Sequence, residues 1–172
     1  MKDVMEIKRD SYLKQLIGYA WDGQVKVITG VRRCGKSYLL RTLYKNYLLE
    51  NGISEDHIIV IELDLARDIR YRNPLELTAY VKERIGNQKE QFYLFVDEIQ
   101  MSDEVPNPYN PNGKHITFYD ALNDLKTISD LDVYVTGSNA KFLSKDVITE
   151  FRGRGDEVRM YPLGFAEFMS VY

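Results

Sequence analysis

The amino-acid sequence predicts an α/β protein in which a mainly parallel β-sheet lies between two layers of helices. Apolar runs alternate with helical patterns from residue 24 to about residue 136, and the runs stay apolar instead of alternating with polar residues. Continuous apolar runs are typical of strands that are buried on both faces, as in a parallel sheet. Because helices must then cover both faces, we expect a three-layer α/β/α sandwich.

Four apolar runs predict the strands of this sheet. The first is a β-branched run over residues 25–29 that ends in Gly30. The other three cover residues 57–63, 91–96 and 133–136. All four have ordinary strand lengths, and short apolar runs bounded by turn residues are typical of buried strands.

Helical spacing of apolar residues predicts one helix before the first strand and three helices between the strands. Asn51-Gly52 ends the first of these three helices as a C-terminal cap does, and Pro74 opens the second at a position where proline is favoured. We expect helices over residues 5–20, 37–50, 74–85 and 116–128.

Residues 102–114 contain three of the five prolines of the chain, among several asparagines. Such a composition predicts a loop within the domain. The loop follows two acidic residues directly, so it is either a simple surface insertion or a contact for a substrate or partner.

The overall composition is ordinary for a soluble globular domain. The chain has 172 residues, 44% of them hydrophobic and 28% charged, with a net charge of −3. We expect one domain over residues 1–172, with residues 1–22 as a helical lead-in. No apolar run approaches the ~18 residues of a membrane helix, and the acidic balance argues against broad binding of nucleic acid.

Cysteine and histidine are too rare for a metal centre built on them. Cys34 is the single cysteine, which excludes an internal disulfide and a multi-cysteine zinc site and fits a reducing cytoplasm. His57 and His115 have no second histidine or cysteine at metal-ligand spacing, so we expect both to be ordinary surface residues.

Residues 30–37 match the pattern G-x-x-x-x-G-K-[ST] in full, after a predicted strand and before a predicted helix. In this pattern backbone N–H groups converge on phosphate oxygens, the lysine adds a point charge, and the serine hydroxyl can ligate Mg²⁺. We expect Lys36 to act in catalysis as well as in binding and Ser37 to hold the metal. The expected nucleotide contacts are Gly30, Val31, Arg32, Arg33, Cys34, Gly35, Lys36, Ser37 and Tyr38.

Cys34 has two interpretations. Loop N–H groups and a helix end lower the pKa of a nearby thiol, which would make Cys34 reactive. The simpler interpretation is a small residue at a variable position of the loop.

The predicted strand over residues 91–96 is followed by Asp97 and Glu98. The carboxyl edge of a parallel sheet is where ligands bind, so these acids are expected beside the phosphate-binding loop. We expect Asp97 to hold Mg²⁺ and Glu98 to polarise the attacking water. A carboxylate directly after the aspartate suits activation of water, and the extra strand over residues 57–63 lies between the lysine and the aspartate. Both features favour a hydrolase over a small-molecule kinase. The alternative is that Asp97 and Glu98 form a solvated acidic turn.

A third polar element lies at the end of the last predicted strand, in Thr136-Gly137-Ser138-Asn139. One of these residues could bond the attacking water or the γ-phosphate. Alternatively, Ser138 or Asn139 caps the helix that would start at Ala140.

With these stretches in place, the chain resembles the extended AAA+ ATPases of a bacterial and archaeal family. Members carry an N-terminal P-loop ATPase module and a C-terminal nuclease-like domain of unknown function. The resemblance runs from about residue 7 to the end, through IKRDSYLKQL, ITGVRRCGKSYLL, LFVDEIQ, TGSNAKFLS and FRGRGDEVRMYPLGFAEFM.

The resemblance implies a hydrolytic P-loop fold in which the acid strand and the polar strand flank the phosphate-loop strand. It implies ATP and Mg²⁺ as cofactors, a sensor at Ser138 or Asn139, and a catalytic arginine finger at Arg154, with Arg152 beside it. It also implies a C-terminal domain that this chain lacks, and residues 165–172 read as the start of a further helix.

The leading functional hypothesis is a Mg²⁺-dependent ATPase module whose hydrolysis changes the conformation of a partner domain. The first alternative is a switch that binds ATP and hydrolyses it slowly. The second is an ATPase that acts on nucleic acid, for which the clustered arginines at positions 32, 33 and 41 are the only sequence support. A homo-oligomer is compatible with all three, and no membrane contact is expected.

Overall fold

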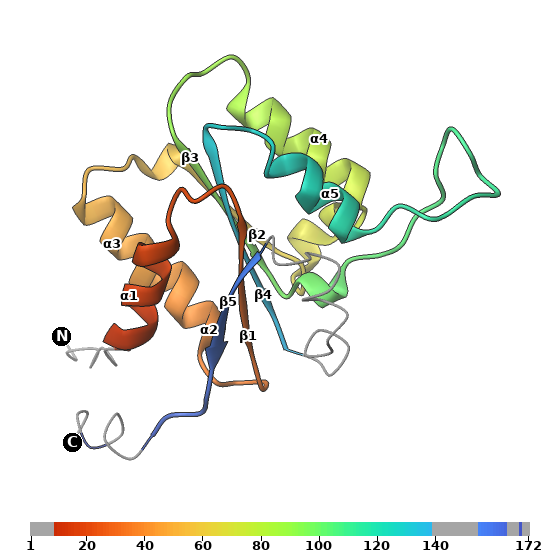
Figure 1. Cartoon of the computed structure of the whole chain (residues 1–172). Coiled ribbons are helices and arrows are strands. Elements are labelled where there is room, and N and C mark those ends of the chain that lie inside the picture. Colours follow the sequence, from red (N-terminus) through yellow and green to blue (C-terminus); the bar gives the residue numbers. More distant parts are fainter. Residues whose placement is uncertain (1–8, 139–154, 165–168, 170–172) are drawn as a thin grey trace.

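A computed structural model describes residues 9–138, 155–164 and 169. Its strands form one five-stranded sheet in the order β2-β3-β4-β1-β5, and every neighbouring pair is parallel (Figure 1). The strands are β1 (Val25–Gly30), β2 (Ile58–Glu62), β3 (Phe92–Asp97), β4 (Leu131–Gly137) and β5 (Gly155–Met160).

Helices cover both faces of the sheet. In Figure 1, α4 (Pro74–Ile85) and α5 (Phe118–Leu125) lie on one side, and α1 (Asp10–Tyr19) lies on the other with the helix that follows β1. Two apolar cores match this arrangement: one packs α4 and α5 against the sheet, and the other packs α1 and the helix after β1. The predicted three-layer α/β/α sandwich is therefore confirmed.

The helix that follows β1 is continuous but not uniform. It begins as α2 (Lys36–Tyr38), widens to π-helical geometry over Leu39–Tyr44, and ends as α3 (Lys45–Glu50). The predicted span of 37–50 is confirmed to within one residue. A π-helical stretch of this kind was not predicted, and such stretches are frequent at functional sites.

Local capping explains where α4 and α5 begin. The Asn73 side chain accepts the Leu75 N–H at 2.9 Å, and Pro74 occupies the first position of α4. Thr117 and Asp120 form a reciprocal capping box at the start of α5. With this box α5 begins at Phe118, two residues after the predicted start, and it ends at Leu125, three residues before the predicted end.

Short 3-10 helices were not predicted. They cover Glu55–His57, Ala66–Arg72 and Ile99–Met101, and the last two come shortly after β2 and β3 at the carboxyl edge of the sheet. Their residues are mostly polar and lack the long apolar repeat by which a helix is recognised.

The order of the strands corrects one expectation. The phosphate-loop strand β1 is flanked by β4 and β5, and the acid strand β3 lies beyond β4. The expectation that the acid strand flanks β1 is therefore wrong, whereas the polar strand β4 does lie beside it. The strand β5 was not predicted, because the exposed Arg159 and half-buried Glu157 interrupt its apolar positions, as suits an edge strand.

The two ends of the chain limit the remaining comparisons. The helix expected over residues 5–20 is described as Asp10–Tyr19, and residues 1–8 lie outside the described part. The start of a helix expected after residue 165 also lies outside it. Within the described residues, no helix has the length and apolar character needed to cross a membrane.

Candidate functional site at the carboxyl edge of the sheet

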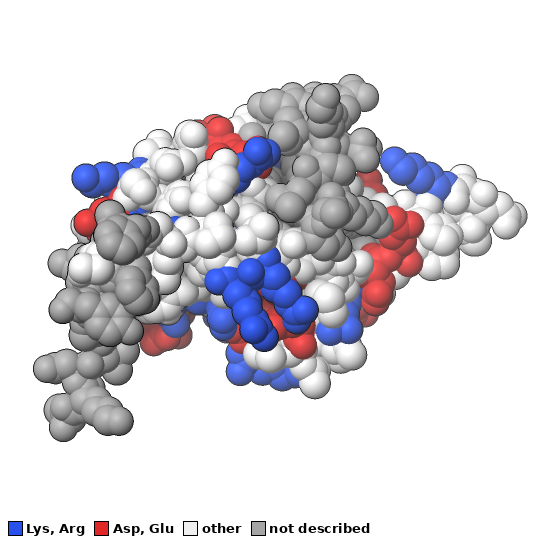
Figure 2. Space-filling view, turned by 90° about the horizontal axis from the view of Figure 1, so that it is seen from below, with Lys and Arg blue, Asp and Glu red and all other residues white. Residues whose placement is uncertain are grey.

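Three parallel strands bring the predicted polar groups to one edge. Gly137 of β4 pairs with Thr29 of β1, and Val135 of β4 pairs with Val96 of β3, so the residues that follow these strands converge. Figure 2 looks at this edge and shows Lys and Arg side chains gathered at its centre, close to acidic ones. The edge thus combines positively and negatively charged side chains.

Two glycines permit the tight path of the phosphate-binding loop. Gly30 has φ 152°, and a Cβ there would lie 2.5 Å from the Met160 carbonyl oxygen and 2.7 Å from the Cys34 sulfur. Gly35 has φ 94° immediately before α2. Both conformations are accessible to glycine at little cost, so the spacing of the motif has a local steric reason.

Lys36 folds back over this loop. Its ammonium donates to the carbonyl oxygens of Gly30 at 3.0 Å and Val31 at 2.8 Å, and the residue is only 4% exposed. These acceptors are neutral dipoles, so they satisfy the donors of the ammonium without neutralising its charge.

Ser37 and Asp97 meet across the site. The Ser37 hydroxyl donates to Asp97 Oδ1 at 2.9 Å, and the Thr136 hydroxyl donates to the same oxygen. Asp97 is 2% exposed. A hydroxyl and a buried carboxylate side by side are the hard oxygen ligands that Mg²⁺ prefers, usually together with waters and substrate phosphates. The residues present therefore fit this metal.

Glu98 is held by three side chains. Its backbone has left-handed dihedrals (φ 59°), and its N–H donates to the Thr136 hydroxyl at 3.0 Å. The Glu98 carboxylate accepts from the Ser138 hydroxyl at 3.1 Å and from the Gln100 amide. Positive φ at a residue other than glycine is uncommon and often marks a functional site.

A second ionic cluster borders the site, and the sequence did not predict it. Glu62, at the end of β2 and 3% exposed, contacts the guanidinium groups of Arg41 and Arg67. Arg41 Nε also lies 3.4 Å from Asp97 Oδ2. Finding this cluster requires the order of the sheet, which brings the end of β2 beside that of β3.

The structure brings five of the predicted residues together: Lys36, Ser37, Asp97, Glu98 and Ser138. The roles assigned to them remain predictions. Val31, Arg32 and Arg33 lie in the same loop and are exposed, and Tyr38 lies in the first turn of the following helix. Asn139, Arg152 and Arg154 lie outside the described residues.

The environment of Cys34 favours one of its two interpretations. The residue is 4% exposed, and its sulfur lies 2.7 Å from the position that a Cβ on Gly30 would take. Buried structural cysteines are generally inert. The structure therefore favours a small residue packed inside the loop.

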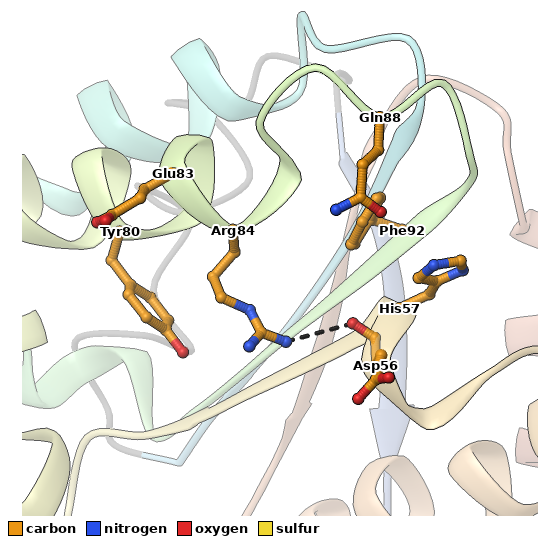
Figure 3. A pocket seen from close by; sticks show the side chains of 7 residues that line it. All are labelled: Asp56, His57, Tyr80, Glu83, Arg84, Gln88 and Phe92. Atoms are coloured by element: carbon orange, nitrogen blue, oxygen red, sulfur yellow. Dashed lines mark hydrogen bonds between the residues drawn. The ribbon is translucent and has the colours of Figure 1, made fainter.

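His57 lies at the amino end of β2, and His115 is exposed just before α5. His57 Nε2 lies 2.7 Å from Glu90 Oε2, and the ring lies beside that of Phe92 with centroids 4.7 Å apart. His57 lines a hollow of about 540 Å³ between α4 and the amino ends of β2 and β3, which Arg84 spans by donating to the Asp56 carbonyl oxygen at 3.2 Å (Figure 3). Within the described ranges, no group of three or more His, Cys, Asp or Glu residues is arranged to hold a metal ion by itself.

The loop over residues 102–114 leaves the body of the molecule (Figure 1). Antiparallel bridges between Val105 and Ile116 and between Asn107 and Asn110 organise it, and Tyr109 is 96% exposed. The predicted loop is confirmed, whereas its role stays a prediction.

The parallel α/β/α fold and the glycine-lysine loop at its carboxyl edge define the class: this is a P-loop nucleotide-binding ATPase domain of the AAA+ type. Residues 22–169 match the family described as an AAA domain, and the chain belongs to that family.

Two curated relatives cover almost the whole chain. The chain is 32% identical over 165 residues to an uncharacterized protein of Haemophilus influenzae, covering 96% of the chain and 38% of the relative. It is 31% identical over 173 residues to an uncharacterized protein of Methanocaldococcus jannaschii, covering 98% of the chain and 32% of the relative. The chain thus spans about a third of the length of these relatives.

Solved structures share the fold at low sequence identity. A Walker-type ATPase of Pyrococcus abyssi is similar with a TM-score of 0.61 and 17% identity, over 96% of this chain and 57% of that one. The Orc1 protein of Aeropyrum pernix, solved in complex with DNA, is similar with a TM-score of 0.59 and 12% identity, over 99% and 50%. At these identities the similarity shows the fold alone.

Proposed function

We propose that this chain is a Mg²⁺-dependent ATPase module that couples ATP hydrolysis to a conformational change in the remainder of a longer protein. One observation carries the proposal: Lys36, Ser37 and the acids 97–98 meet at a single edge of the sheet. The length of the relatives supports a partner within the same chain, since the matched region is about a third of each.

The loop residues would bind the phosphates of ATP. Lys36 would exchange the carbonyl oxygens of Gly30 and Val31 for phosphate oxygens, which are charged and therefore stronger acceptors. Ser37 and Asp97 would hold Mg²⁺, which when bound neutralises developing charge on the phosphates. Thr136 would keep Asp97 oriented through its hydroxyl bond.

Glu98 would orient and polarise the attacking water. Ser138 and Gln100 both donate to Oε2, which would orient the carboxylate so that Oε1 could accept a hydrogen from the water. Ser138 or Asn139 would sense the γ-phosphate at this point. Gln100, which donates to both Glu98 and Ser138, would help to hold these two side chains in place.

Arg154 lies outside the described residues, and its proposed role as an arginine finger is argued from the strand that follows it. Gly155, the next residue, pairs with Val25 at the amino edge of the sheet, whereas Met160 pairs with Gly30 at the carboxyl edge. Five strand residues separate the two edges by roughly 16 Å. An arginine finger at position 154 would therefore act on a neighbouring subunit, or engage only when the rest of a longer protein positions this segment, and Arg152 is the next candidate.

The slow-hydrolysing switch is the second candidate function. The observation that favours it is the pair of donors on Glu98 Oε2, which would leave one carboxylate oxygen rather than two to meet the attacking water. A nucleic-acid role has less support, because Arg41 and Arg67 are paired with Glu62.

Steady-state ATP hydrolysis by the full-length protein and by its Glu98→Gln variant tests the proposal. Losing a general base costs about 10²-fold or more in rate, while Mg-ATP binding should persist. Glu104→Gln is the matched control, because Glu104 is exposed in the projecting loop. If Glu98→Gln hydrolyses ATP at the rate of the parent protein, Glu98 has no catalytic role and the switch is favoured.

A further inference from the structure

Three segments that are far apart in the sequence meet at the guanidinium group of Arg9. Nη1 donates to the carbonyl oxygen of Cys34 in the phosphate-binding loop, and Nη2 donates to that of Tyr161 at 2.8 Å. Arg9 is 3% exposed, although it lies just before α1. A buried arginine that spends two of its donors on backbone carbonyls of separate segments constrains both.

Tyr12 strengthens this junction. Its ring lies under the guanidinium, with Arg9 Cζ 4.7 Å from the ring centroid. Its hydroxyl also accepts the Tyr161 N–H at 3.3 Å. Both backbone polar groups of Tyr161 are therefore bonded to the segment that contains Arg9 and Tyr12, at the point where the chain leaves β5.

On the loop side, Arg9 controls the orientation of one peptide group. In a trans peptide the C=O and the following N–H point in opposite directions. Since Arg9 holds the Cys34 carbonyl on its own side, the Gly35 N–H is turned to the opposite side. Gly35 suits this position because its φ of 94° is rarely adopted by other residues, and a Cβ there would be in van der Waals contact with Arg9 Nη1, at 3.4 Å. Backbone N–H groups of this loop are the donors that would receive phosphate.

We propose that Arg9 is a positioning residue that orients the Cys34–Gly35 peptide for phosphate binding and transmits the occupancy of the loop to the chain that leaves β5 at Tyr161. The inference rests on the proposed ATP binding. It adds a route by which nucleotide binding in the loop affects the segment after β5. When phosphate draws the Gly35 N–H, the Cys34 carbonyl moves with it. Arg9 then shifts its second bond, which is to Tyr161.

Hydrogen exchange of the full-length protein, with and without Mg-ATPγS, tests this route. In the parent, nucleotide should change the exchange of peptides that cover Tyr161. In Arg9→Ala we expect ATPγS to bind about tenfold more weakly, because a charge-assisted hydrogen bond is lost. At a saturating nucleotide concentration, the response at Tyr161 should fall by at least half. Lys14→Ala, an exposed cation of α1, is the matched control and should retain both.

Two further measurements separate positioning from a general loss of structure. Added guanidinium ion at tens of millimolar should restore part of the affinity of Arg9→Ala, which a misfolded variant would not show. Tyr12→Phe keeps the ring under Arg9 but removes the acceptor for the Tyr161 N–H. It should bind ATPγS as the parent does, with a smaller response at Tyr161, and it serves if Arg9→Ala fails to fold.

The outcomes distinguish this inference from the proposed function. A full Tyr161 response in both folded Arg9→Ala and Tyr12→Phe, with nucleotide bound, overturns the coupling alone. A parent protein that binds no ATPγS overturns the proposed function, and the coupling with it.

Discussion

The two edges of the sheet each bury a lysine, and the difference lies in what the lysines contact. At the amino edge, Lys26 is fully buried and contacts two carboxylates, those of Asp132 and of Asp22 at 2.8 Å. At the carboxyl edge, Lys36 is almost as buried but contacts the carbonyl oxygens of its own loop. Within the described part of the chain, no carboxylate pairs with Lys36.

The chemistry of the partners determines what each lysine can do. An ammonium that is paired with carboxylates gains nothing by moving to another anion, and separating it from them leaves uncompensated buried charge. An ammonium held by neutral carbonyls can exchange them for phosphate oxygens with a gain in electrostatic energy. Burial alone therefore does not separate a structural lysine from a ligand-binding one; the charge of the partners does.

The amino edge has further partners that make it rigid. Asp132 Oδ2 accepts the Trp21 N–H at 3.0 Å and the Tyr134 hydroxyl at 2.7 Å. The Tyr134 and Tyr44 hydroxyls are 2.6 Å apart, and burial raises the pKa of both phenols, so they stay neutral. This network joins β1, β4 and the helix after β1 by hydrogen bonds.

The largest expected effect is on stability, from Lys26→Met. The substitution preserves length and packing but leaves Asp132 as an unpaired buried carboxylate, which costs about 3–5 kcal/mol. Urea unfolding measures the loss. Lys45→Met is the matched control, because Lys45 pairs with the exposed Glu55 and such pairs contribute about 1 kcal/mol or less.

Adding Asp132→Asn to Lys26→Met removes the unpaired charge and should recover part of the loss. An unchanged loss in the double variant would show that packing of the Lys26 stem, rather than charge pairing, dominates this edge.

A smaller effect is expected from Asp156, at the start of β5. Burial, followed by a hydrogen bond with Asp22, raises the pKa of Asp156 from 3.8 to about 6. The folded protein therefore retains this proton at pH values where the unfolded chain has lost it. Its contribution to stability is present below about pH 4 and is lost as pH rises towards 6. The hydrogen bond from Asp156 also lowers the pKa of Asp22. The contribution of Asp22 to stability is therefore present above about pH 4 and is lost as the pH falls below that value.

Asp156→Asn keeps a hydrogen-bond donor towards Asp22 at every pH. We expect the variant to be more stable than the parent at pH 7, by about 1 kcal/mol after allowance for solvent screening, and equal to it near pH 4.5. Urea midpoints from pH 4.5 to 7.5 measure the difference, with the exposed Asp64→Asn as the control. A difference that does not depend on pH would exclude the shared proton.

Features that depend on a local sequence pattern could be predicted, whereas contacts between distant segments could not. The loop over residues 30–37 was predictable, because its chemistry depends on a local spacing of glycine, lysine and serine. The ends of β3 and β4 were also predictable, since polar residues that follow apolar strands must gather at one edge of a parallel sheet.

Contacts between distant segments were not predictable. Lys26 appears in the sequence as a break in an apolar strand, and its partner Asp132 is 106 residues away. Arg9 bonds to a carbonyl oxygen 152 residues further along the chain. Neither leaves a local pattern, and β5 itself is masked by the charged residues of an edge strand.

Titration of Mg-ATP into the full-length protein and its Lys36→Ala variant tests whether the carboxyl-edge lysine is the ligand-binding one. We expect the affinity to fall by about 1.5–3 kcal/mol, or about 10- to 150-fold, because a charge-assisted contact with phosphate is lost. The urea midpoint should stay close to that of the parent, and the exposed Lys89→Ala should change neither quantity. An unchanged dissociation constant in folded Lys36→Ala would contradict the assignment of this loop to ATP.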